Sequence, residues 1–467
     1  MLFSSISFLY YFLPIVLGLY YIVPKQFKNL ILLISSLFFY FYGEPKYFIL
    51  MLISITSGYF HGLWIDKIRN SKYAKIPMIS SIIVSVGILV YFKYLDFLIV
   101  NINSFFSLSI SPLYLVLPIG ISFYTFQILS YTIDVYKDEA KVQKNILDFA
   151  TYVSLFPQLI AGPIVRYTTV EQELSHRTHS LEKTAYGIHR FIIGLSKKII
   201  LANTLGEVVK IFGDLAEKTV VFYWMSAISF ALQIYFDFSG YSDMAIGLGK
   251  ILGFNFLENF NYPFISKSIT EFWKRWHISL GTWFRDYVYI PMGGNRVSKL
   301  RWVWNILLVW FLTGLWHGAE WNFIIWGLYF ALLLVLEKYF IKDILKRLPS
   351  LISHLYVLFF IIISFVIFNG NGIVDVKVNL MGMFGFLDIP LWNFETRYYL
   401  KSYGLVLAVG CITSTPIASS LVSKLKTYKY PRLIMDILHP MIIVFLLLII
   451  TGYLIDGSFN PFLYFRF

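Results

Sequence analysis

The chain has 467 residues, of which 58% are hydrophobic, 19% are aromatic and only 14% are charged. Soluble domains carry about 25% charged residues, so this composition excludes an ordinary water-soluble protein. The net charge of +13 is then explained by Lys and Arg in cytoplasmic loops rather than by a nucleic-acid surface.

Apolar runs long enough to cross a bilayer as helices recur from one end of the chain to the other, whereas a barrel would need short alternating strands. They predict an all-α polytopic protein with about 11–12 spans, at 3–23, 30–42, 47–63, 76–92, 116–136, 186–206, 220–238, 303–317, 321–338, 351–368, 404–422 and 434–455. The first run lacks a basic segment and a cleavage site, so we expect it to be a retained span. No internal repeat is visible, and we expect a single domain, 1–467.

The stretch 147–164 is apolar but is interrupted by Pro157, Gly162 and Pro163. Irregular backbone at membrane depth is tolerated only where protein buries it or water lines it. We therefore expect this stretch to be re-entrant or interfacial and to form a wall of a cavity.

Lys and Arg concentrate in alternate loops. The basic loops are 24–29, 66–75, 165–198, 239–302, 338–350 and 424–432, and the loops between them carry few cations. Because cytoplasmic loops are enriched in Lys and Arg, this pattern predicts that both termini lie outside.

His317 lies at the end of a predicted span, in the segment Thr313–Trp321 with the sequence TGLWHGAEW. Gly314 and Gly318 leave room for backbone or substrate, and Trp316 supplies a flat apolar wall. A neutral imidazole here could accept a proton from a hydroxyl during acyl transfer. The alternative is a buried histidine bonded to a carbonyl, or an interfacial anchor beside tryptophans.

His277 lies in the segment 271–287, EFWKRWHISLGTWFRDY. A continuous helix would place an aromatic stripe on one face and cations elsewhere, with Trp273, Trp276, Leu280 and Trp283 in the stripe. Such a helix can lie in the headgroup plane. The functional alternative is a donor site, in which cations meet the phosphates of coenzyme A (CoA) or phosphopantetheine; the candidates are Lys274, Arg275, Arg285 and Arg296.

Three further positions combine polar or reactive groups with apolar surroundings. Asp237 is expected at the cytoplasmic end of a span, where it either orients a histidine or forms an ion pair. Gln158 lies in the broken stretch. Cys411 is the one cysteine and has no polar neighbours in its run, so we expect it to be a packing residue.

The combined motifs resemble the membrane-bound O-acyltransferase (MBOAT) family, and within it the bacterial alginate and peptidoglycan O-acetylation branch. The resemblance runs along the whole chain and is carried by Phe156–Arg166, Asp237–Ala245, Phe272–Leu280, Trp283–Tyr287, Ile290–Arg296, Leu315–Ala319 and Asn460–Phe467. One segment, Ser364–Gly372, departs from the family pattern, because relatives commonly carry a tryptophan and a Phe-Arg pair there. An arginine contact and partner specificity are open at that segment.

The resemblance implies a ring of spanning helices with re-entrant or interfacial helices, a central channel and funnels to both faces. It implies that His317 is the catalytic residue, that His277 is a second important residue, and that Gln158, Asp237, Trp276 and Trp316 line the channel. It further implies an acetyl donor in the cytoplasm, expected to be acetyl-CoA, with no bound cofactor and no metal.

The expected partners are an exported acetyltransferase and a cell-surface polysaccharide, and the expected location is the bacterial cytoplasmic membrane. Two alternatives stay open. One is transfer of D-alanine or another acyl group from a carrier-protein thioester, and the other is a glycan transporter or flippase.

Overall fold

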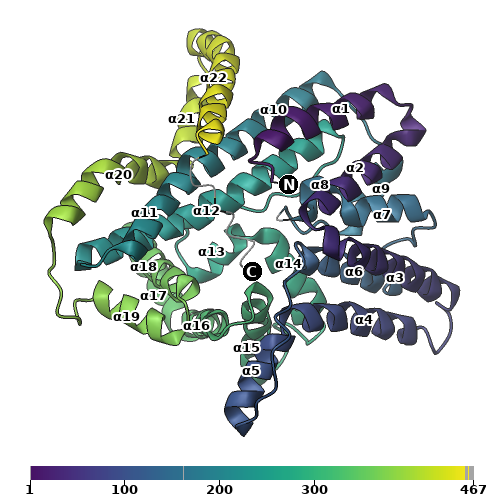
Figure 1. Cartoon of the computed structure of the whole chain (residues 1–467), viewed down its shortest axis with the longest axis horizontal. Coiled ribbons are helices and arrows are strands. Elements are labelled where there is room, and N and C mark those ends of the chain that lie inside the picture. The colour runs from purple at the N-terminus through teal and green to yellow at the C-terminus, as the bar shows by residue number, and fades with distance from the viewer. Residues whose placement is uncertain (1, 161, 458–460, 462–467) are drawn as a thin grey trace. The chain divides into compact units, whose positions relative to one another are not determined.

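The computed structural model describes residues 2–160, 162–457 and 461, and the motif Asn460–Phe467 lies outside them except for Pro461. The described residues form helices, turns and loops but no strand (Figure 1). Contacts divide the chain into two compact units. Unit 1 comprises Met1–Phe191 with Ser242–Leu257, and unit 2 comprises Ile192–Tyr241 with Glu258–Phe467. The single domain 1–467 stays a prediction.

Unit 1 contains the N-terminal helices. They are η1 (Ser7–Phe12), α1 (Leu13–Ile22), α2 (Lys28–Gly43), α3 (Phe48–Lys67), α4 (Lys75–Lys93), α5 (Leu95–Phe106), α6 (Ile121–Tyr136), α7 (Ile146–Ser154), α8 (Phe156–Leu159), α9 (Tyr167–Ser175) and most of α10 (Leu181–Ser196). Helices α3, α4 and α6 pack against one another, side by side in Figure 1. The stretch 147–164 is broken in the structure, because α7 and α8 are short and Leu155 separates them. Its re-entrant or interfacial position and its role as a cavity wall stay predictions.

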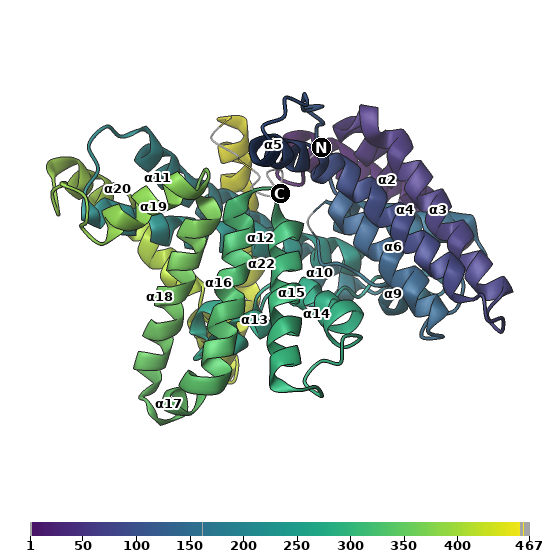
Figure 2. The same ribbon diagram turned by 90° about the horizontal axis from the view of Figure 1, so that it is seen from below.

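Unit 2 contains the remaining helices. They are η4 (Lys197–Ala202), α11 (Asn203–Asp214), α12 (Val220–Ile251, which ends in unit 1), α13 (Ile269–Arg275), α14 (Ile278–Phe284), η6 (Arg285–Tyr289), α15 (Lys299–His317), α16 (Trp321–Leu336), η7 (Glu337–Ile341), α17 (Lys342–Arg347), α18 (Ser350–Asn369), α19 (Ile373–Met383), α20 (Phe394–Thr413), α21 (Ile417–Leu425) and α22 (Lys429–Ile455). Helix α16 packs between α15 and α18, and α17 lies at the shared end of α16 and α18 (Figure 2).

Six helices of the described chain are long and apolar enough to cross a membrane: Pro45–Lys67, Lys75–Lys93, Val220–Ile251, Trp321–Arg347, Ser350–Asn369 and Lys429–Ile455. A seventh span is possible if α20 and α21, which are bent by 66°, count as one. The fold is therefore all-α and polytopic. Most of the other predicted spans are also helices, but they are shorter or more polar.

Helix boundaries differ from the predicted spans at several places. Helix α12 continues to Ile251 instead of ending near residue 238, so Asp237 lies inside the helix and not at its end. The predicted span 404–422 is bent between α20 and α21. Helices α5 and α19 fall in segments that we expected to be loops.

Two glycines let α15 and α16 approach closely. A β-carbon on Gly327 would lie 2.2 Å from the carbonyl oxygen of Trp310, and one on Gly314 would lie 2.4 Å from that of Phe323. A β-carbon on Gly318 would lie 2.2 Å from the Phe323 ring. The room beside His317 is therefore filled by α16, which is the backbone alternative of the two that the sequence left open.

Candidate active site in unit 2

His277 interrupts the helix that we predicted over the segment 271–287. Helix α13 ends at Arg275, α14 begins at Ile278, and His277 between them has a left-handed backbone with φ of 45°. A residue other than glycine rarely adopts this conformation, and such strain clusters at functional sites. The continuous amphipathic helix is therefore wrong, because the chain turns at His277 and directs that side chain into the protein.

Asn259 fixes the tautomer of His277. The oxygen Oδ1 of Asn259 accepts the backbone N–H of Ser279 (3.1 Å) and its hydroxyl (2.9 Å), so the same atom can only accept from Nδ1 of His277, at 3.2 Å. Nδ1 therefore carries the ring proton, and Nε2 keeps its lone pair. Nε2 is buried and has no hydrogen-bond partner within the described part of the chain.

Aromatic rings surround the His277 imidazole. The Phe238 ring lies edge-on at 4.6 Å between centroids, and the Trp316 ring lies at 5.7 Å. Only 2% of His277 is exposed, and burial lowers its pKa to about 3. The imidazole is therefore neutral near pH 7, which is the form that can accept a proton.

His317 ends α15 and lies in an aromatic cage. Its ring is 4.9 Å from the Trp316 ring, 4.9 Å from the Trp326 ring and 5.3 Å from the Phe368 ring. Trp316 thus contacts both histidines and lies between them. Trp276, which precedes His277, lies 5.4 Å from Phe365. We call Trp276, Trp316, Phe365 and Phe368 the aromatic wall.

A cavity of about 1110 Å³ is lined by His277 and by Thr313, one turn before His317, among other residues. Its lining comes from α13 to α18, and six cations contribute to it: Lys267, Lys274, Arg285, Lys338, Lys342 and Lys346. One acid, Glu337, belongs to the same lining. We call it the basic cavity, and its volume is that of a pocket for a large small-molecule ligand.

The four predicted donor-binding cations occupy different places. Lys274 and Arg285 line the basic cavity, whereas Arg275 and Arg296 are not among its lining residues. Arg275 forms an ion pair with Glu271 at 2.9 Å, and Arg296 is exposed after a glycine turn. Three further lysines at four-residue spacing line the cavity and were not predicted from the sequence: Lys338, Lys342 and Lys346.

A second cavity of about 600 Å³ lies among α11, α12, α18 and α19. Four amide side chains line it: Gln233, Asn369, Asn371 and Asn379. Two lysines and two aspartates also line it: Lys210, Lys218, Asp214 and Asp375. We call it the amide cavity. Phe365 of the aromatic wall belongs to its lining.

Two predicted channel residues lie elsewhere in the structure. Asp237 forms a buried ion pair with Lys198 at 2.7 Å, and Lys198 also donates to the Pro461 carbonyl. Gln158 belongs to unit 1, where its Nε2 donates to the Tyr152 carbonyl at 2.6 Å. Neither residue lines the basic cavity or the amide cavity. Their roles in a channel stay predictions.

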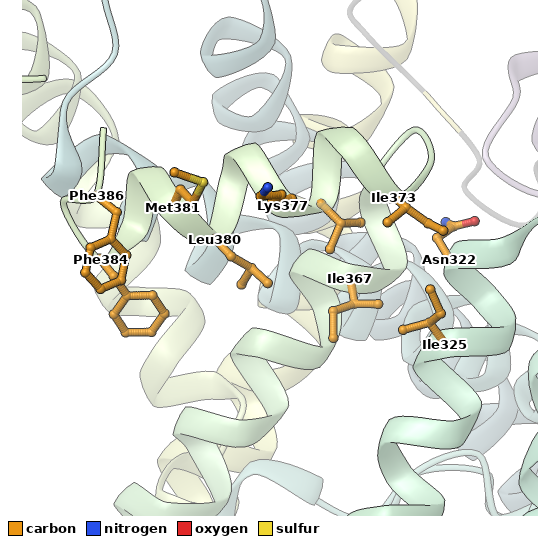
Figure 3. Close-up of a pocket in the computed structure, with 10 residues that line it drawn as sticks. Asn322, Ile325, Ile367, Ile373, Lys377, Leu380, Met381, Phe384 and Phe386 are labelled. Atoms are coloured by element: carbon orange, nitrogen blue, oxygen red, sulfur yellow. The ribbon is translucent and has the colours of Figure 1, made fainter. Parts of the chain in front are cut away.

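A third hollow has no catalytic group. Figure 3 shows Ile325, Ile367 and Leu380 from α16, α18 and α19 around this apolar groove of about 420 Å³. Asn322 and Lys377 are its two polar lining residues. Among the residues that the structure describes, no group of three or more His, Cys, Asp or Glu could hold a metal ion.

Comparison with known proteins identifies the chemistry. The model of MBOAT, the membrane-bound O-acyltransferase family, matches residues 85–374. The chain belongs to the MBOAT family. It is an O-acyltransferase, and both histidines and the two cavities' main lining segments lie within or beside the matched region.

Relatives narrow the branch of the MBOAT family. The chain is 41% identical over 397 residues to "Probable alginate O-acetylase AlgI" of Azotobacter vinelandii, covering 84% of this chain and 79% of that protein. It is 34% identical over 427 residues to the peptidoglycan O-acetyltransferase of Helicobacter pylori, covering 84% and 81%. It is 30% identical over 272 residues to the teichoic acid D-alanyltransferase of Bacillus subtilis, covering 54% of this chain and 69% of that protein.

Proposed function

We propose that this MBOAT protein transfers acetyl from acetyl-CoA in the cytoplasm toward a hydroxyl outside, for O-acetylation of a cell-surface or secreted polysaccharide. The observation that carries the proposal is the position of His317. On one side, His317 follows Thr313, which lines the basic cavity, and its neighbour Trp316 contacts His277, which lines the same cavity. On the other side, His317 contacts Phe368 of α18, and α18 also lines the amide cavity.

His317 acts as the general base. It takes the proton of the acceptor hydroxyl while the hydroxyl oxygen attacks the thioester carbonyl carbon. The C–O bond forms, the C–S bond breaks, and the imidazolium returns the proton to the thiolate. His277, neutral and with Nε2 free to accept, assists at the end of the basic cavity.

The donor enters through the basic cavity. Lys274 and Arg285 line it and suit the phosphates of a CoA thioester, because charge-assisted bonds to phosphate oxygens are strong. Arg275 and Arg296 were expected in this role, but they do not line this cavity.

The acceptor side is the amide cavity. Its residues Lys218, Asn371 and Asn379 belong to the cation-poor segments that were predicted as loops and are expected outside. Amide and carboxylate groups suit hydroxyl-bearing molecules. Relatives carry names for alginate and peptidoglycan acetylation, and both an exported acetyltransferase partner and a polysaccharide acceptor fit that side. The proposed location is the bacterial cytoplasmic membrane.

Two other functions make different demands on the chain. Transfer of D-alanine from a carrier-protein thioester is favoured by likeness to a teichoic acid D-alanyltransferase, but that likeness covers 54% of this chain. A glycan transporter or flippase would not require the histidines, and the family match to acyltransferases disfavours it.

The test measures acetate released by mild base from isolated cell-surface polysaccharide. Cells that carry the His317→Ala variant are expected to lose O-acetylation, because no other group replaces the base. His439→Ala, at an exposed position on α22, is the matched control and should retain it. Full acetylation by the His317→Ala variant would exclude the proposed mechanism.

A further inference from the structure

The basic cavity carries a row of lysines on one helical segment. Lys338, Lys342 and Lys346 follow one another at four-residue spacing along η7 and α17, so they lie on one face of the segment. Lys338 is held against the wall of the cavity, because its Nζ lies 3.4 Å from the centroid of the Trp302 ring. Lys267 and Lys274 add to this charge from the α13 side.

The acid of the basic cavity does not neutralise these lysines. Both carboxylate oxygens of Glu337 accept hydrogen bonds at the start of α13, from the backbone N–H groups of Ile269 (2.6 Å) and Thr270 (3.0 Å) and from the Thr270 hydroxyl (2.5 Å). A carboxylate that is used in this way stabilises the N-terminus of a helix. Glu337 therefore anchors α13 to the segment that bears the lysines.

Two of the lining cations already have carboxylate partners. Arg285 pairs with Asp286 at 2.6 Å, and Lys346 pairs with Asp343 at 2.8 Å. The other four have no ion pair within the described part of the chain: Lys267, Lys274, Lys338 and Lys342. The basic cavity thus presents uncompensated positive charge to whatever enters it.

The two classes of thioester donor differ in negative charge. A CoA thioester carries a diphosphate and a terminal 3′-phosphomonoester, the latter with about two negative charges near neutral pH. The phosphopantetheine arm of a carrier protein has one phosphodiester and hence a single charge. The positive charge of several lysines without ion pairs matches the negative charge of a CoA thioester. It exceeds the single negative charge of a phosphopantetheine thioester.

We propose that Lys338 and Lys342, together with Lys267 and Lys274, bind the phosphates of a CoA thioester and select it over a phosphopantetheine thioester. The inference rests on the proposed function, since the thioester carbon has to reach His277, which lines the same cavity, and His317, which packs on the same Trp316 ring. Lys338 and Lys342 are specificity-determining residues, and they lie away from the reacting atoms.

The test combines a double variant with three donors. Wild type and Lys338→Gln/Lys342→Gln protein in lipid nanodiscs receive acetyl-CoA, acetyl-dephospho-CoA (which lacks the 3′-phosphate) or acetyl-phosphopantetheine. The last is supplied as its methyl phosphodiester, which carries a single charge like the arm of a carrier protein. An isolated cell-envelope polysaccharide fraction serves as acceptor. Lys424→Gln/Lys426→Gln, which removes two exposed charges outside the basic cavity, is the matched control.

In the double variant, kcat/KM for acetyl-CoA should fall tenfold or more through KM, because charge-assisted contacts to phosphate are lost. The value for acetyl-phosphopantetheine should change less than about threefold, and preference for acetyl-CoA over acetyl-dephospho-CoA should shrink. An equal loss with all three donors, or a wild type without preference for acetyl-CoA, would overturn the inference.

Direct binding separates this inference from the proposed function. Calorimetric titration of CoA and dephospho-CoA into nanodiscs needs no turnover. If wild type prefers CoA, the double variant loses that preference and no donor is turned over, then the lysine assignment stands and the proposed function fails. If wild type turns over acetyl-CoA but binds CoA and dephospho-CoA equally well, the lysine assignment is wrong and the proposed function stands.

Discussion

At the scale of single residues, Asn259 holds His277 in one tautomer. Replacing Asn259 by Ala removes the acceptor of Nδ1–H and leaves the backbone N–H of Ser279 unpaired. Losing such a buried hydrogen bond costs about 1–3 kcal/mol, so kcat of acetyl transfer should fall by roughly tenfold. Ser279→Ala keeps the Asn259–His277 bond and is the control, and equal kcat in both variants would contradict the role of the tautomer.

The burial of neutral His277 also makes stability depend on pH. The pKa is lowered to about 3 in the folded protein, against about 6.5 in an unfolded chain. Between these values the unfolded chain binds a proton that the folded protein does not. The stabilising contribution is therefore complete above about pH 6.5, and it falls as the pH drops, by roughly 2 kcal/mol at pH 5.

The measurement is the thermal unfolding midpoint in nanodiscs at pH 7 and pH 5. Wild type should lose more stability on acidification than His277→Gln, because glutamine has no such proton to bind. His439→Gln, which changes an exposed histidine, should keep the wild-type slope. Parallel slopes for wild type and His277→Gln would show that His277 is not buried in its neutral form.

At the scale of elements, the contact between α15 and α16 depends on glycine. Gly327→Ala places a β-carbon 2.2 Å from a backbone oxygen, which the rigid helix backbone cannot avoid. Overpacking costs about 1–3 kcal/mol or more, so we expect a lower unfolding midpoint and reduced activity, since α15 carries His317. Gly404→Ala in α20, where nothing lies within 4 Å, should be neutral or slightly stabilising. A Gly327→Ala protein of wild-type stability would contradict this packing.

The length of the apolar runs in the sequence predicted most of these helices. The positions of the charged residues predicted little about where the helices end. The spans 76–92, 321–338 and 351–368 correspond closely to α4, α16 and α18, because a continuous apolar run has few other ways to satisfy its backbone in a membrane. No glycine or proline stands at the break at His277, so the local sequence contains no signal from which it could be predicted. It results from tertiary bonds between Asn259 and the 277–279 backbone and side chains, which lie 18 to 20 residues away in the sequence.

The candidate site was predicted in part. His277 and His317 could be selected because ionisable groups in apolar context are costly, and the structure places both on the Trp316 ring. Which cations line the basic cavity and which do not could not be predicted, because this depends on the tertiary contact between the start of α13 and Glu337 of η7. The four-residue spacing of Lys338 and Lys342 was the available signal for the remaining lining cations.

At the scale of the whole molecule, the charge pattern predicts which side of the membrane each loop faces. In a Cys411→Ser background, an impermeant maleimide should label Asn371→Cys in intact spheroplasts. Lys346→Cys, in a basic loop, should react only after permeabilisation, because that loop is expected in the cytoplasm. The opposite labelling pattern would invert the orientation and with it the side from which the donor enters.

The charged and amide groups that line the two cavities have an electrical consequence. These groups favour water in both cavities, and water conducts ions better than lipid does, so a voltage across the membrane is concentrated over the layer of protein that separates the cavities. Moving one elementary charge through that layer requires about 2.3 kcal/mol per 100 mV. Under the proposed function, an acetyl group is uncharged and passes without electrical work, while the anionic part of its donor stays behind. That layer would then insulate an energised membrane and still pass a cargo that the field does not affect.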